Sequence, residues 1–169
     1  VKLWGIMEAA AKAAVTEDRT SFLPHGVVVS RSIDTNSGLD FLILQLPSGR
    51  SLYYPEPAIT QNRFGGPSVS YMGQNQTTKK WERIETYGGK LAENLTQAVA
   101  RDCLADAITR LEEAGFPVVF HIHDEIVVDV SPEKQDLAEM KRLMAAVPKW
   151  AEGLPLKAEG WSNEFFKKD

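Results

Sequence analysis

Residues 116–131 read FPVVFHIHDEIVVDVS, in which two short apolar runs flank a polar triplet at residues 123–125. Val, Ile and Phe dominate both runs, and these residues favour strands because their side chains suit a pleated, half-buried backbone. The pattern predicts a β-hairpin with the carboxyl groups of Asp124 and Glu125 at its tip. Two adjacent carboxylates at one bend repel each other, so a divalent cation is a natural companion for this tip.

Alternation assigns the side chains of the first apolar run to two faces. Successive strand residues point to opposite sides, so Val118, Phe120 and Ile122 are expected to share one face. His121 and His123 then share the other face, where His121 is expected to pack or hydrogen-bond beneath the tip.

The residues of the tip leave three interpretations open. His121-x-His123-Asp124 has the spacing of a transition-metal site, because alternate strand residues place two imidazoles within reach of one ion. Alternatively, Asp124 and Glu125 hold Mg²⁺, which prefers oxygen ligands and keeps waters and substrate phosphates in its shell. That arrangement serves phosphoryl transfer by two metal ions and needs a further carboxylate from another strand. In the third interpretation the tip is a solvated turn of a non-catalytic binding module.

Composition predicts a globular protein. The 169 residues, 43% of them hydrophobic, suffice for a real core, and residues 1–169 are expected to form a single region. A net charge of −4 argues against holding nucleic acid by bulk positive charge alone. Cys103 is the single cysteine, and no apolar run approaches the roughly 20 residues that span a membrane. We therefore expect no membrane partner and a reducing, cytoplasmic location.

The N-terminal half is expected to combine one helix with several strands. Apolar residues at helical spacing predict a helix over residues 1–15. Because the chain starts at Val1 and passes directly into this pattern, we expect an excised C-terminal fragment. Short strands are expected at residues 27–30, 41–46 and 51–54. Residues 58–80, rich in Gly, Asn, Gln, Ser and Thr, predict a long connection with a single strand at 69–72.

The clearest helix is predicted over residues 90–114, with an apolar stripe and, beside it, a polar row. Glu93, Gln97 and Arg101 form that row at i, i+4 and i+8, where the helix can contact a ligand. Since this helix leads directly into the hairpin, both are expected to line one cleft.

Two further elements are expected after the hairpin. Ser131 is placed as the cap of a helix that has Pro132 at its first position. Residues 154–166 are expected to form a last strand beside the hairpin. The chain as a whole predicts an α+β fold, in which a small antiparallel sheet carrying the hairpin packs against several helices.

Several segments in this order resemble one enzyme family. The run HIHDEIVVDV resembles motif C of the family A DNA polymerases, the relatives of bacterial DNA polymerase I. The preceding TYGGKLAENLTQAVARDCLADAI is similar to a palm helix of that family, and most similar to its bacteriophage and prophage version. LPSGRSLYYP, KKWERIETYGGK and LPLKAEGWSNEFF also look like the phage subgroup. The resemblance implies the C-terminal part of a polymerase palm with a fingers-proximal segment.

The resemblance implies roles for four of the residues already singled out. Asp124 matches the motif C aspartate that binds the catalytic Mg²⁺ ions, and Glu125 matches the carboxylate beside it. His123 matches a residue near the primer terminus. Gln97 matches the helix glutamine that contacts the duplex in its minor groove, where an amide can both donate and accept.

The helix departs from the family pattern one turn before Gln97. Bacterial members carry an asparagine four residues before that glutamine, whereas this chain has Glu93 there and Asn94 next to it. Both are kept as DNA-binding candidates. Arg101 is inferred to contact phosphate, and the alternative is a structural ion pair with Glu93 or Asp102.

The function that the resemblance implies is template-directed DNA synthesis. The parent protein would add deoxynucleotides to a primer 3′ end with Mg²⁺, or Mn²⁺ as a substitute, and its partners would be primer–template DNA and dNTP in a bacterial host cell. Motif A and motif B are expected upstream of this chain, so the isolated fragment is expected to be inactive. Apolar surface left exposed would favour self-association. The alternatives remain a metal-dependent hydrolase built on His121, His123 and Asp124, and a binding module.

Overall fold

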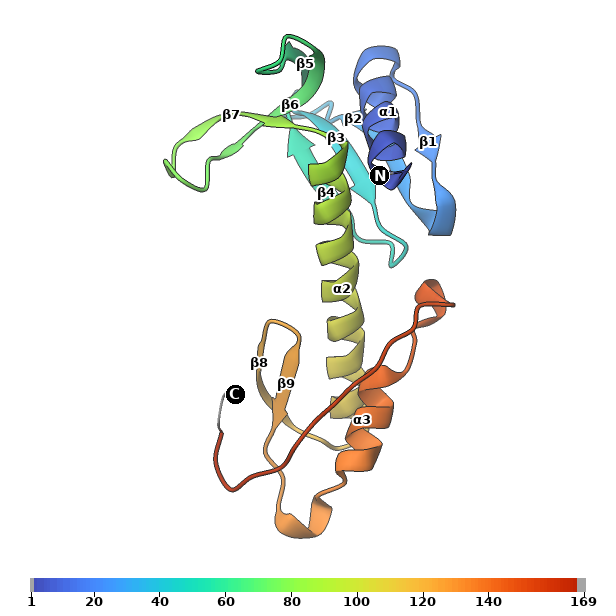
Figure 1. Cartoon of the computed structure of the whole chain (residues 1–169), viewed down its shortest axis with the longest axis vertical. Coiled ribbons are helices and arrows are strands. Elements are labelled where there is room, and N and C mark those ends of the chain that lie inside the picture. The colour runs from blue at the N-terminus through green and yellow to red at the C-terminus, as the bar shows by residue number, and fades with distance from the viewer. Residues whose placement is uncertain (1, 167–169) are drawn as a thin grey trace. The chain divides into compact units, whose positions relative to one another are not determined.

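The computed structural model describes residues 2–166, which form two compact units, one ending at Val99 and the other beginning at Ala100 (Figure 1). The fold is α+β, as predicted. Within the described residues, the α-helices α1 (Lys2–Glu17), α2 (Gly88–Glu113) and α3 (Leu137–Ala145) accompany small antiparallel sheets. The boundary between the units falls within α2. The expectation that the chain acts as a single region stays a prediction.

In the first unit, α1 packs against a four-stranded antiparallel sheet. In spatial order its strands are β1 (Ser21–Phe22), β2 (Val28–Ile33), β3 (Asp40–Gln45) and β4 (Ser51–Pro55), with a 3₁₀ turn η1 (Pro24–Gly26) after β1. Ala11 and Ala14 are buried, and their small side chains let the helix lie close to the strands. Val29, Leu42 and Leu44 complete the contact from the sheet, and burial of each stabilises the fold by about 1.5–3 kcal/mol. The predicted first helix is confirmed from Lys2 onward, its first residue lying outside the described residues, and so are the strands expected at residues 27–30, 41–46 and 51–54, whereas β1 was not predicted.

A second antiparallel sheet follows, where the sequence predicted one long connection. Its order is β5 (Ala58–Gln61), β6 (Pro67–Gln74), β7 (Trp81–Thr86). The strand predicted at 69–72 is confirmed as part of β6. The long connection expected over the rest of residues 58–80 was wrong, because β5 and the β6–β7 hairpin occupy that stretch. The polar composition hid these strands because their buried side chains include hydroxyls: Ser68 Oγ donates to Thr86 O at 2.7 Å, and Ser70 Oγ donates to Ala58 O at 3.3 Å.

The start of α2 is tied closely to α1. Gly88 lies so near the helix that a Cβ atom there would come within 1.9 Å of the carbonyl oxygen of Trp4. Its backbone N–H donates to the carboxylate of Glu8 at 3.3 Å, which satisfies one of the free donors at the helix N-terminus. Leu91 and Leu95 then join the core of the first unit.

The second unit contains the predicted hairpin. Its strands are β8 (Val118–Ile122) and β9 (Glu125–Val128), paired antiparallel. Gly115, with φ of 84°, ends the preceding helix in the left-handed conformation that glycine adopts most readily. The carbonyl oxygens of Leu143 and Ala146 at the end of α3 accept hydrogen bonds from Arg110 of α2, at 3.0 and 2.9 Å. These bonds anchor α3 to the last turns of α2.

Two predictions for the segments after the hairpin were wrong. Ser131 makes no side-chain capping bond, and the chain forms only a 3₁₀ turn, η2 (Pro132–Lys134), before α3. Asp136 caps α3 instead, accepting from Glu139 N at 2.9 Å. A further 3₁₀ turn, η3 (Lys149–Ala151), follows α3.

The expected last strand is also absent from the described residues, because residues 154–166 are irregular. Phe166 nevertheless meets the hairpin through an edge-to-face contact with Phe120, with 5.1 Å between ring centroids. The final segment therefore lies on β8 through side-chain packing and not through a strand ladder.

Candidate functional site

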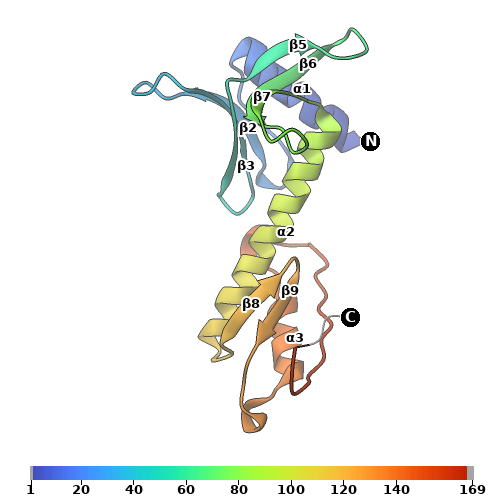
Figure 2. The same cartoon turned by 90° about the vertical axis from the view of Figure 1, so that its left-hand side faces the viewer.

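The hairpin β8–β9 presents its acidic tip on a two-residue turn (Figure 2). Ile122 pairs with Glu125, so His123 and Asp124 are the turn residues. His123 has φ of 52°, as the first turn residue of the favoured two-residue hairpins requires, and histidine tolerates this region better than most residues. The side chains of His123, Asp124 and Glu125 are all exposed. The predicted acidic tip is thus present.

The faces of β8 differ from the predicted alternation. The register shifts between Val118, which pairs with Val128, and Phe120, which pairs with Val127, so Val119 is an extra, bulged residue. Directly paired residues share a face, and Val118 therefore lies on the face opposite Phe120 and Ile122. The prediction that Val118, Phe120 and Ile122 share one face was therefore wrong, because the bulge at Val119 turns Val118 to the other side.

The two histidines do not share a strand face. Regular alternation ends at Ile122, because His123 is a turn residue with a left-handed backbone. His121 is exposed and does not pack beneath the tip as expected. Across residues 2–166, no three His, Cys, Asp or Glu side chains gather where they could hold a metal ion. The structure thus offers no assembled transition-metal site on His121, His123 and Asp124.

The donor set at the tip consists of hard oxygen ligands. Asp124 and Glu125 are adjacent and exposed, so their carboxylates are accessible to an ion from solvent. Mg²⁺ usually takes only one or two protein carboxylates and completes its shell with waters and substrate phosphates. The two residues therefore fit part of a magnesium site that needs further ligands from elsewhere.

In the first unit, the candidates on α2 already have partners within that unit. Glu93 forms an ion pair with Lys90 at 3.0 Å and accepts a weaker bond from Gln97 Nε2 at 3.4 Å. Asn94 is half-buried, and its Nδ2 donates to the hydroxyl of Tyr54 at 3.0 Å. Burial raises the pKa of Tyr54, so its hydroxyl remains a neutral partner. Asn94 thus joins α2 to the sheet, while Gln97 is the exposed amide of the row.

Arg101 belongs to the second unit and is exposed. Within residues 2–166 it forms neither of the two ion pairs considered for it, with Glu93 or with Asp102. Its guanidinium is therefore available to an anionic ligand. Cys103 of α2 is buried, and burial raises the pKa of its thiol, which keeps it protonated and inert.

Sequence reasoning left one exposed group of side chains out of the candidate site, at the turn between β6 and β7. Lys79 and Lys80 lie at the end of what was predicted to be a long connection, and Trp81 follows them directly. The available signal was Asn75 followed by Thr77 and Thr78, since Asn and Thr side chains favour tight turns by bonding to nearby backbone.

The sequence is 44% identical over 170 residues to the DNA polymerase of Bacillus phage SP02. This chain is similar to part of a phage DNA polymerase. The alignment covers 100% of the chain and 25% of that relative, so the chain spans about a quarter of the length of the polymerase it matches. The resemblance to a phage DNA polymerase predicted from the motifs is confirmed at this level.

Two other comparisons gave no match. No protein-family model matches the chain. No solved structure is significantly similar to it. Assignment to family A therefore stays a prediction. In the described residues, no helix has the length and apolar character to cross a membrane.

Proposed function

We propose that the chain is the palm portion of a family A, phage-type DNA polymerase, which catalyses template-directed nucleotidyl transfer to a primer 3′ end. The observation that carries the proposal is the 44% identity of the whole chain to part of a phage DNA polymerase. The exposed carboxylates of Asp124 and Glu125 on a two-residue turn support it. The partners are primer–template DNA and dNTP in the cytoplasm of the bacterial host.

In this proposal, Asp124 and Glu125 are the residues that would hold magnesium, with manganese as a substitute. Such an ion supplies Lewis-acid activation of the primer hydroxyl and neutralises charge on the triphosphate. Asp124 contributes its carboxylate from the turn itself, and Glu125 contributes from the first position of β9. Being exposed, both carboxylates are free to meet a substrate that approaches from solvent.

Further residues of the chain position the DNA. His123, exposed in the turn beside Asp124, donates or accepts a hydrogen bond at the primer terminus. Gln97 offers an exposed amide to minor-groove acceptors, and Arg101 offers an exposed guanidinium to backbone phosphate. Glu93 and Asn94 act indirectly, since Glu93 neutralises Lys90 and Asn94 holds α2 to Tyr54.

We further propose that the 169-residue chain does not polymerise by itself. The tip supplies two carboxylates, and residues 2–166 gather no third metal-ligating side chain beside them. Two-metal catalysis needs at least one more carboxylate, which the proposal assigns to the motif A aspartate of the parent. Template-directed extension of a primer by the isolated chain would contradict this.

The decisive experiment replaces Asp124 with Asn in the complete parent polymerase. Extension of a labelled primer should fall roughly 10³-fold or more, because several kcal/mol of transition-state charge stabilisation is lost. Binding of primer–template, measured by gel shift, should be retained. Asp129→Asn is the matched control, since Asp129 is an exposed carboxylate beyond the opposite end of β9. Normal synthesis by the Asp124→Asn variant would refute the proposed function.

A further inference from the structure

The turn between β6 and β7 exposes a compact group of cationic and aromatic side chains. Lys79 and Lys80 are exposed, and Trp81, the first residue of β7, has 65% of its surface accessible. Trp81 pairs directly with Gln74, so this exposed amide lies on the same face of the hairpin as the indole. We call Lys79, Lys80 and Trp81 the β6–β7 tip.

The backbone beneath these side chains is fixed by its own hydrogen bonds. Asn75 Oδ1 accepts from Thr77 N at 2.8 Å and from Thr78 N at 3.1 Å. The backbone N–H of Lys79 donates to Asn75 O at 2.8 Å, and Gln74 Nε2 donates to Lys79 O at 3.1 Å. Lys79 is held at φ of 58°, a conformation that costs about 1–2 kcal/mol in a non-glycine residue. The turn therefore presents its side chains from a defined, preorganised backbone.

The two ammonium groups have no acidic partner in the part of the chain that the structure describes. Glu82, the first carboxylate after them along the chain, accepts from Asn75 Nδ2 at 2.5 Å and from Thr78 Oγ1 at 3.4 Å. Among residues 2–166, neither Lys79 nor Lys80 forms a side-chain hydrogen bond or an ion pair. The charge of the turn is thus directed to solvent, although the chain as a whole is acidic.

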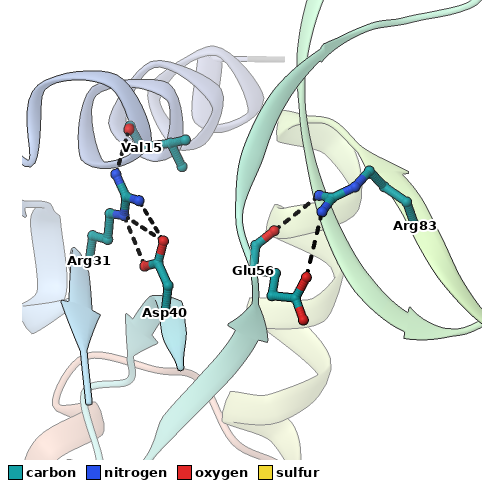
Figure 3. Close-up of polar contacts among 5 residues, drawn as sticks. All are labelled: Val15, Arg31, Asp40, Glu56 and Arg83. Atoms are coloured by element: carbon teal, nitrogen blue, oxygen red, sulfur yellow. Dashed lines mark hydrogen bonds and ion pairs between the residues drawn. The ribbon is translucent and has the colours of Figure 1, made fainter. Parts of the chain in front are cut away.

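Other cationic groups of the same sheet are already satisfied. At the opposite end of β6, the guanidinium of Arg63 stacks on the ring of Phe64, 4.7 Å from its centroid. Arg83 donates to Glu56 O at 3.0 Å and lies 3.9 Å from the Glu56 carboxylate (Figure 3). The β6–β7 tip therefore differs from its neighbours in keeping both its cations and its aromatic face unengaged.

We propose that the β6–β7 tip binds single-stranded DNA, with Lys79 and Lys80 on successive phosphates and Trp81 stacked on a base. Ammonium groups release counterions from the phosphate backbone, and every base offers a π-face to an aromatic side chain. A single strand is the form in which base faces are accessible, because bases in a duplex are stacked on each other. The proposal rests on the proposed function, which brings unpaired template to the protein.

The experiment measures binding of fluorescein-labelled oligothymidylate to the full 169-residue chain by anisotropy, over a salt series. Trp81→Ala should weaken binding roughly 5- to 100-fold, while Trp81→Phe, which keeps a stacking ring, should retain most of the affinity. Lys79→Ala with Lys80→Ala should reduce the slope of log affinity against log salt by about 1.4, or 0.7 for each lost phosphate contact. Equal urea midpoints for all variants establish that each one folds.

The matched control is Arg63→Ala with Phe64→Ala, which removes one cation and one aromatic ring from the other turn of the same sheet. This variant should bind oligothymidylate like the unaltered chain. The proposal is overturned if the unaltered chain does not bind oligothymidylate, or if the tip variants bind as it does. It is also overturned if both turns matter equally, or if the tip instead governs binding to anionic vesicles or an acidic peptide. Asp124→Asn tests the proposed function separately, since a metal-binding role at Asp124 does not depend on the β6–β7 tip.

Discussion

Arg31 on β2 donates hydrogen bonds both to the carboxylate of Asp40 on β3 and to the carbonyl oxygen of Val15 near the end of α1 (Figure 3). The Nε–Oδ1 distance is 2.9 Å, and the bond to Val15 O is 3.0 Å. One guanidinium thus satisfies a terminal carbonyl of the helix and neutralises an acid at the start of β3.

Arg31→Ala should lower the free energy of unfolding by roughly 1–3 kcal/mol, because it removes a bidentate contact and leaves Asp40 partly buried without its cation. Urea unfolding followed by circular dichroism measures the change. Arg19→Ala is the control, since Arg19 is exposed and lies 3.7 Å from Glu17 in a surface pair that contributes little. An equal loss of stability in both variants would show that the contacts of Arg31 with Asp40 and Val15 contribute no more to the free energy of unfolding than a surface ion pair does.

Gly88→Ala should destabilise the chain by about 1–3 kcal/mol or more, because the added methyl group meets backbone and not a flexible side chain. The nearest atoms would be Trp4 O at 1.9 Å and Trp4 C at 2.8 Å. Gly5→Ala provides a contrast: Gly5 lies within α1 with open space around it, so alanine there should stabilise the helix by about 0.5–1 kcal/mol. Thermal melts of the two variants should shift in opposite directions, and a harmless Gly88→Ala would contradict the close approach of the two helices.

Glu8 should make the stability of the chain depend on pH. The hydrogen bond from Lys12 lowers the pKa of Glu8 below its ordinary value of 4.5, burial opposes this, and the Gly88 N–H adds to the lowering. A lowered folded-state pKa means that the stabilisation is present above pH 4.5 and is lost as the pH falls through the folded-state value. The stability difference between the unaltered chain and Glu8→Gln should therefore be largest near neutral pH and shrink in acid. A constant difference from neutral pH to strongly acidic conditions would exclude this linkage.

Two variants of His123 distinguish the effect of its backbone conformation on stability from the chemical role of its imidazole. His123→Gly should leave the hairpin as stable or more stable, whereas His123→Val should destabilise it by about 1–2 kcal/mol, because only glycine adopts φ of 52° without strain. Urea midpoints measure both changes in the isolated chain. In the parent polymerase, both variants should reduce primer extension if the imidazole contacts the primer. Full activity of His123→Gly would remove His123 from the proposed site.

The local sequence pattern was sufficient to predict those helices and strands whose characteristic residues lie within a few positions of one another. The hairpin β8–β9 followed from apolar strands around residues 123–125, and α2 followed from its apolar stripe. The same local reading failed at Ser131, because the Asp136 side chain lies closer to the first turn of α3 and makes the capping bond.

Tertiary contacts decided the remaining features. β5, β6 and β7 are largely polar, and the buried serines of β6 are satisfied only by neighbouring strands, so the sequence marked only residues 69–72 of this sheet as a strand. The bulge at Val119 depends on pairing with β9, and it separated side chains that simple alternation had placed together. The sequence by itself determined the acidic tip and the similarity to a phage polymerase, since both depend on residue identity and order. Only the tertiary structure decided which side chains remain unengaged, because the partners of Asn94, Glu82 and Arg83 are distant along the chain or reached across a turn.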